Sequence, residues 1–214
     1  DRDIDNTRMV MPYPERVSGE QPKNLKYRAN WNGPVIVSPH NPSVIYYGSQ
    51  YMMKSTDRGV NWEVISEDLT RNNKEHQGKG GFPISNEQIT AESYNNLFNI
   101  EESPITEGVI WVGSDDGLVH LSKDGGNTWI NVTPKGLKEG IINVVEPSPH
   151  DPAALTTKPP RSYPPRHSFP PQYVPLHKVR DCFAKISIYP SNDEFPTLRQ
   201  STKPQPTARK QSPT

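Results

Sequence analysis

One pattern, Ser-x-Asp-x-Gly-x-x-Trp, occurs twice in this chain and limits its fold more than any other feature. Its residues are Ser55, Asp57, Gly59 and Trp62 in the first copy, and Ser122, Asp124, Gly126 and Trp129 in the second. The flanking sequence repeats as well, because VIVSPHNPSVIYYGS precedes the first copy, NIEESPITEGVIWVGS the second, and NVVEPSPHDPA opens a third unit. The Ser-Pro prolines Pro39, Pro104 and Pro149 are 65 and 45 residues apart. A period in the forties is typical of a four-stranded propeller blade, and the first interval carries an insertion.

Each unit reads as short strands separated by turn residues. In the second unit, Val109 to Gly113 is a β-branched and aromatic run, Asp116-Gly117 is a tight hairpin signal, and Leu118 to Ser122 returns. The Ser-x-Asp-x-Gly segment fits the next turn, since short polar side chains accept bonds from turn N–H groups and glycine supplies positive φ. The fold class predicted is therefore all-β.

These motifs resemble the Asp-box family, also called bacterial neuraminidase repeats. That family includes sialidases, xyloglucan-type glycoside hydrolases and sortilin-type receptors, and the flanks LKYRANWNGPVIVSPHNP and WVGSDDGLVHLSKDGGNTW are similar to bacterial sortilin-like or glycosyl-hydrolase-like secreted proteins. The resemblance implies a fragment of an Asp-box β-propeller, with about two full blades plus partial blades, in an extracytoplasmic protein. It also implies that the eight repeat residues are structural. The box does not indicate a chemistry, because enzymes and receptors share the fold.

Composition divides the chain near Pro152. Residues 1–152 hold all 14 Gly and all four Trp, whereas residues 153–214 hold 12 of the 24 Pro and carry 10 basic against 3 acidic residues. We predict a partial propeller over 1–152 and a Pro-rich tail over 153–214 without persistent structure after about Ala154, although Lys185 to Tyr189 could form one strand. The repeat ends within a strand after HDPA, which favours a reading-frame error or a junction over a genuine disordered extension.

Several functional classes are disfavoured. The 24 basic and 24 acidic residues give no net charge that would favour nucleic acid, and no apolar run is long enough to span a bilayer. Cys182 is the only cysteine and lies in the tail, so the globular part has no disulfide or cysteine zinc site. His40 and His150 sit in equivalent turns without a second ligand nearby, so we expect no metal and no cofactor.

The connections on the face opposite the Asp-boxes are where binding residues are expected. The longest is the insertion between about Ser66 and Asn96, and long insertions between regular elements often carry function. The candidate ligand-binding residues are Tyr51, Lys74, His76, Phe82 and Tyr94. The candidate catalytic carboxylates are Asp115, Glu87 and Glu92. The GKGG run lacks the spacing of a phosphate loop, and Arg71 alone does not make the arginine cluster of sialidases.

Two hypotheses follow. The first is a non-catalytic ligand-binding or scaffold portion of a sortilin-like propeller protein, whose partners are a peptide or glycan and the remaining blades of the parent. The alternative is part of a glycoside hydrolase, which needs two facing carboxyl groups. We expect Trp62 and Trp129 to be largely buried beside their turns, and Asp57 and Asp124 to accept backbone hydrogen bonds within them.

Overall fold

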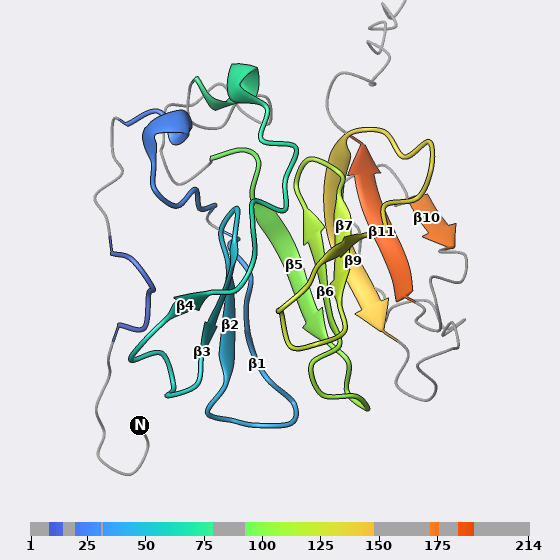
Figure 1. The fold of residues 1–214 in the computed structure, drawn as a ribbon. Helices are drawn as coiled ribbons and strands as arrows, with labels where there is room; N and C mark the ends of the chain where they lie inside the picture. The colour runs from blue at the N-terminus through green and yellow to red at the C-terminus, as the bar shows by residue number, and fades with distance from the viewer. Residues whose placement is uncertain are drawn as a thin grey trace, which may run out of the picture.

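The computed structural model describes residues 9–14, 20–30, 32–78 and 93–147, and two further strands at 172–175 and 184–190 by their backbone. Figure 1 shows these parts as strands joined by long connections. The described residues contain two short 3₁₀ helices, η1 (Pro22–Asn24) and η2 (Lys74–Gln77), and no α-helix. None of the helices in the described part is long and apolar enough to cross a membrane.

Two four-stranded antiparallel sheets form the body of the molecule, as the repeat predicts. In each sheet every strand pairs with the next along the chain. The first contains β1 (Val35–Val37), β2 (Ile45–Gly48), β3 (Met52–Ser55) and β4 (Glu63–Val64). The second contains β5 (Leu97–Glu102), β6 (Ile110–Ser114), β7 (Val119–Ser122) and β8 (Ile130–Asn131). This is the order of a propeller blade, with an inner strand leading through successive hairpins to an outer one.

A third sheet begins with β9 (Gly140–Pro147), which opens the third repeat unit. It pairs with β11 (Ala184–Pro190), which pairs in turn with β10 (Gln172–Pro175). The run Lys185 to Tyr189 is therefore a strand, and it has a neighbour in β9 where the sequence indicated none. The rest of the predicted tail lies outside the described residues.

The hydrophobic cores lie between neighbouring sheets. One core joins side chains from the first sheet, among them Tyr46 and Met52, to Leu97 and Ile110 of the second. The other joins Trp111 and further side chains of the second sheet to β9. Each sheet thus buries its apolar side chains against the next sheet, as repeat units do.

Two glycines set how closely these sheets approach. Gly48 ends β2 and Gly113 lies one residue before the end of β6, and each is followed by serine. A Cβ on Gly48 would lie 3.0 Å from the Cβ of Leu97 on β5, and a Cβ on Gly113 would overlap the side chain of Ile142 on β9. Both positions let the inner strand of the following sheet pass close to the second strand of the preceding one.

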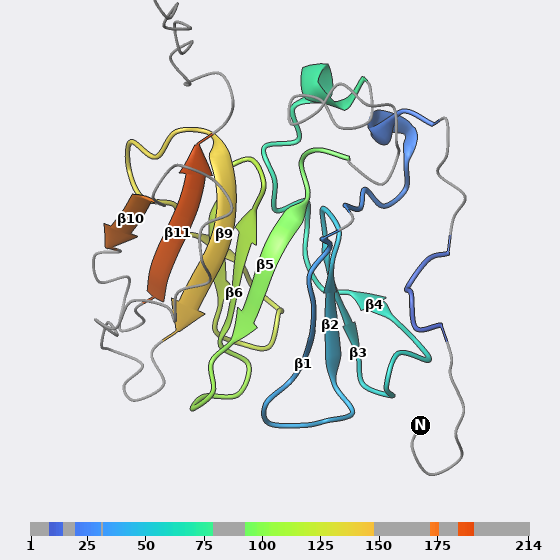
Figure 2. The ribbon, with the colours of Figure 1, turned by 180° about the vertical axis from the view of Figure 1, so that it is seen from behind.

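The connections gather on two faces (Figures 1 and 2). The β2–β3 and β6–β7 turns lie on the same face as η1 and η2, drawn at the top of Figure 1. The β1–β2 loop lies at the bottom of that view. We call the face with η1 and η2 the insertion face, because η2 belongs to the connection between β4 and β5.

Candidate functional site

A buried arginine organises the insertion face. Arg28 is 3% exposed and lies in the segment that follows η1. Its Nη2 is 2.8 Å from Oδ2 of Asp68 and 3.2 Å from Oγ1 of Thr70, and its Nε donates to the carbonyl oxygen of Asn95 at 3.0 Å. The backbone N–H of Arg28 donates to Oε1 of Gln50, in the β2–β3 turn, at 2.7 Å. One guanidinium therefore ties the start of the chain to both ends of the insertion.

Asp116 is the acceptor on the second sheet for the same network. Its Oδ2 accepts from the backbone N–H of Arg71 at 2.8 Å and from the side-chain amide of Asn95 at 2.5 Å, and its Oδ1 accepts from Ser114 Oγ. Arg71 Nε also donates to the carbonyl oxygen of Asp116 at 2.7 Å. Gly117 has φ +88°, as the hairpin interpretation of Asp116-Gly117 requires. Asp116 is therefore a structural carboxylate.

Asp115, the neighbour of Asp116, is also buried. Its side chain is only 1% exposed, and Oδ1 accepts from the backbone N–H of Asn96 at 2.9 Å. Oδ2 is buried with no hydrogen-bond partner in the described structure. Burial raises the pKa of Asp115 well above its usual range, the charge of Asp116 raises it further, and the Asn96 N–H and Arg28 oppose the shift. A group held in this way favours its protonated form and does not reach solvent.

His76 and Glu139 form a partly exposed part of the site, above the buried Tyr94. Tyr94 is buried and donates through its hydroxyl to Oε1 of Glu139 at 2.5 Å. His76 Nδ1 lies 3.5 Å from the same oxygen, and its ring centroid lies 5.7 Å from that of Tyr94. Burial, followed by the hydrogen bond to Glu139, raises the pKa of Tyr94, so its hydroxyl remains a donor. The side chains of His76 and Glu139 are 24% and 33% exposed.

Three tyrosines form a second exposed group on this face. Tyr13 and Tyr27 meet edge to face with ring centroids 5.3 Å apart, and Tyr27 and Tyr51 do so at 6.1 Å. The ammonium of Lys26 lies 4.7 Å from the centroid of the Tyr13 ring and 5.2 Å from that of Tyr27. Such a group offers aromatic surface with polar hydroxyl edges, which suits recognition of a partly polar ligand.

The first repeat turn has the hydrogen bonds that its sequence predicts. Ser55 Oγ accepts from the backbone N–H of Gly59 at 2.8 Å and donates to Oδ1 of Asp57 at 2.8 Å. Asp57 Oδ1 accepts from the backbone N–H groups of Val60 and Asn61 at 3.0 and 2.9 Å. These bonds, the one from Asn61 foremost, lower the pKa of Asp57 to about 2.

The second turn repeats the arrangement. Ser122 Oγ accepts from Gly126 N–H at 2.9 Å and donates to Oδ1 of Asp124, which accepts from the backbone N–H of Thr128 at 2.9 Å. Asp124 Oδ2 accepts from the Thr128 hydroxyl at 2.6 Å. Both turn aspartates are therefore bound within their own turns, as expected.

The two repeat tryptophans depart from expectation in burial. Each lies beside its own turn, but both are half-buried and not largely buried. Trp129 Nε1 donates to the carbonyl oxygens of Gly126 at 3.1 Å and of Ile65 in the preceding sheet at 2.8 Å. Trp62 instead meets Tyr47 of its own sheet edge to face at 6.2 Å. The spacing of the repeat predicts where each tryptophan lies along its unit, but it does not give the exposed fraction of the side chain.

The structure brings together some of the predicted site residues. His76 and Tyr94 meet at Glu139, whereas Lys74 donates to Gln77 at 3.2 Å within η2. Tyr51 belongs to the tyrosine group, and Asp115 lies beneath the site. His40 contacts the carbonyl oxygen of Ser103 at 2.8 Å in the turn position expected of it. The remaining candidates Phe82, Glu87 and Glu92, and also His150, lie outside the described residues.

Sequence reasoning missed Arg28, Gln77, Asn95 and Glu139. Gln77 is fully buried and donates to Asn72 and to Asn95, both of which adopt left-handed φ values of +50° and +64°. The dense Asn content of the insertion was a usable signal, because Asn tolerates that conformation better than other residues with a Cβ. Within the described ranges, no group of three or more His, Cys, Asp or Glu side chains is placed to hold a metal ion.

Comparisons with known proteins add little to this geometry. No family model matches the chain, and no curated protein matches it. Among solved structures, the chain is similar to one described as an ancestral GH74 enzyme, with a TM-score of 0.38 and 20% sequence identity. The match covers 58% of this chain and 13% of that one. A likeness at this level does not assign the chain to a family.

Proposed function

We propose that this chain is the non-catalytic, ligand-binding portion of an extracytoplasmic Asp-box propeller protein of the sortilin-like kind. It binds a peptide or glycan on the insertion face. The observation that carries the proposal is a difference in exposure between the carboxylates and the aromatic side chains of that face. Asp115 and Asp116 are buried in the described structure, whereas aromatic and titratable side chains remain partly exposed at the surface.

A glycosidase of the usual kind needs one protonated carboxyl group and one ionised carboxylate, both reaching the substrate. Asp115 and Asp116 are adjacent in sequence, yet they are 1% and 0% exposed. Arg28 and Arg71 are likewise held by internal partners, which argues against a sialidase carboxylate clamp among the described arginines. A substrate would have to displace several of these bonds to reach either carboxylate.

The surface groups have the opposite character. The tyrosine group and the pair of His76 and Glu139 are partly exposed, and Tyr51 and His76 each adjoin a residue of the buried network, Gln50 and Gln77 respectively. Rigid support of this kind lowers the entropy lost when a ligand is bound, because the contacting side chains are already ordered.

Binding tests this proposal directly. The chain is titrated against peptide and glycan panels, and the strongest ligand is then measured by calorimetry with Tyr51→Ala, His76→Ala and the control Val60→Ala. Tyr51→Ala and His76→Ala should each weaken binding at least fivefold, because both remove surface contacts. Val60 is exposed near the first repeat turn on the other face, and its variant should bind like the parent. Equal affinity in all three variants would contradict the proposal.

The glycoside hydrolase alternative is favoured by one observation, the raised pKa of Asp115, because a general acid must hold a proton near neutral pH. It is tested by the release of reducing ends from β-linked polysaccharides. Hydrolysis by the parent chain that Asp115→Asn abolishes, with the fold intact, would replace the non-catalytic proposal with this alternative.

A further inference from the structure

A groove lies where the inner strands of the three sheets end. Its walls come from Ile36 and Val37 of β1, Glu101 of β5, and Val144 to Pro147 of β9. We call it the axial groove, and its volume is about 610 Å³. That volume is within the range of about 300 to 1,000 Å³ found for ligand pockets. The groove is separate from the insertion face, since these strands run toward the opposite side (Figure 1).

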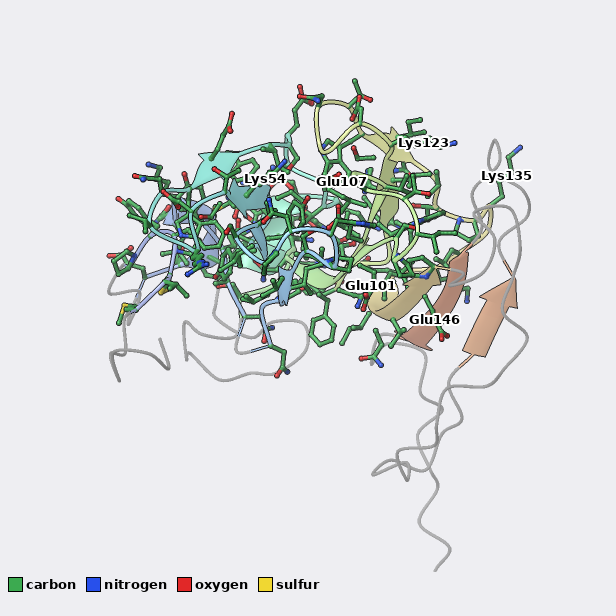
Figure 3. The ribbon with its side chains drawn as sticks, turned by 90° about the horizontal axis from the view of Figure 1, so that it is seen from below. Lys54, Glu101, Glu107, Lys123, Lys135 and Glu146 are labelled. Carbon is green, nitrogen blue, oxygen red and sulfur yellow. The ribbon has the colours of Figure 1, made fainter. Side chains whose placement is uncertain are left out.

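The charged side chains that line the axial groove are all acidic among the described residues. Glu101 and Glu146 face it from neighbouring inner strands, and none of the described residues that line it is basic. Figure 3 shows these two glutamates on β5 and β9, away from the labelled lysines. Pro39, Pro104 and Pro147 also line the groove, and proline has no backbone N–H to donate. The described side chains that line the groove therefore supply hydrogen-bond acceptors from the glutamates and no nitrogen donors.

Glu102 gives an independent indication that a donor is missing. It lines the groove and is only 4% exposed. Its Oε1 accepts from the backbone N–H of Gly108 at 2.9 Å, but its Oε2 is buried without a hydrogen-bond partner in the described structure. A buried carboxyl oxygen with no donor is unfavourable.

The two rim glutamates also act on each other. Burial raises the pKa of Glu101, the charge of Glu146 raises it further, and a hydrogen bond from Asn99 opposes the shift. A cation placed beside both carboxyl groups would offset the charge of Glu146 that acts on Glu101.

The apolar residues in the wall of the axial groove indicate which kind of cation fits it. Ile36, Val37, Val144 and Val145 give apolar surface beside the carboxylates. A long side chain with an aliphatic stem and a charged end matches this pairing, and the guanidinium fork can serve two carboxylates at once. We propose that the axial groove binds an arginine-bearing segment of a partner polypeptide. This inference does not depend on the ligand of the insertion face.

The test uses a fluorescein-labelled peptide, acetyl-Leu-Arg-Leu-Arg-Leu-amide, and the same peptide with citrulline in place of both arginines. Citrulline keeps the shape and removes the charge. Fluorescence anisotropy with the 214-residue chain should show saturable binding of the arginine peptide and at least tenfold weaker binding of the citrulline peptide. The double variant Glu101→Gln/Glu146→Gln should also weaken binding of the arginine peptide at least tenfold.

A matched variant controls for net charge. Glu63→Gln/Glu67→Gln removes two exposed carboxylates at and just after the outer strand β4, and it should bind within twofold of the parent. The groove variant should melt at the same or a higher temperature, since it relieves the repulsion between Glu101 and Glu146. If the groove variant binds more weakly while its melting temperature is unchanged, the loss of affinity comes from a lost contact and not from unfolding.

Three results would overturn the proposal. The first is equal binding of the arginine and citrulline peptides. The second is equal weakening by the two double variants, which would mean that only overall charge attracts the peptide. The third is displacement of the peptide by spermidine at an equal concentration, which would show that the groove recognises a bare cation and no polypeptide.

Discussion

Asp115 is a buried carboxyl group with a strongly raised pKa. Its pKa is raised in the folded chain, so the folded state holds this proton more tightly than the unfolded state, whose value is 3.8. Stability from this group is therefore fully present below pH 3.8 and declines as the pH rises through the window above it. We predict that Asp115→Asn reduces the fall in unfolding free energy between pH 5 and pH 8, measured by urea unfolding at both values.

Asp116 also has a raised pKa, chiefly through burial, but it accepts bonds from Arg71, Asn95 and Ser114. Its replacement by Asn leaves one acceptor oxygen for three donors and sets an NH2 group against the others, so Asp116→Asn should lower stability at both pH values. If Asp115→Asn left the pH dependence unchanged, the proton would have to reside on another group.

The repeat aspartates behave in the opposite way. Turn hydrogen bonds lower the pKa of Asp124, so its contribution is present above pH 3.8 and is lost as the pH falls below that value. We predict that Asp124→Asn lowers the melting temperature at pH 7 and leaves insertion-face binding unchanged, because the turn lies on the other face. Thermal unfolding with a binding titration checks this, and a large loss of affinity at unchanged stability would contradict it.

At the scale of elements, glycine marks where one sheet meets the next. Gly113 lies on β6 against Ile142 of β9, with no room for a Cβ. We predict that Gly113→Ala costs about 1–3 kcal/mol, as overpacked core positions do. Gly78 is the matched control, because no atom of the described residues lies within 4 Å of its added Cβ and its φ is −80°. Urea unfolding of both variants measures the difference, and equal stabilities would show that β9 can shift at no cost.

Whether an element could be predicted from the sequence depends on how far apart in the chain its interacting residues lie. The second hairpin was predictable, since Val109 to Gly113, Asp116-Gly117 and Leu118 to Ser122 are local signals, and β6 and β7 lie there. The polar network was not, because Arg28 meets Asp68 and Asn95 across 40 and 67 residues. Single-sequence patterns do not identify such pairs. The pairing of β11 with β9 was missed for the same reason.

At the scale of the whole molecule, both cores are shared between sheets. Met52 lies in the core between the first and second sheets, and Ile142 lies in the core between the second sheet and β9. We predict that Met52→Ala and Ile142→Ala each cost about 2–5 kcal/mol. Their double variant should lose the sum to within about 0.5 kcal/mol, because the two side chains belong to separate cores. Urea unfolding checks this, and a large coupling energy would indicate one continuous core.

Because each core is shared between two sheets, the chain can gain or lose length most easily by whole repeat units. Because Gly48 and Gly113 seat the following inner strand in the same manner, a duplicated unit would inherit a ready-made docking surface. It would add one complete core to the array, and loss of a unit would remove one. Genetic gain or loss of whole units would therefore preserve every surviving junction, whereas a change of a few residues within a unit would disrupt two.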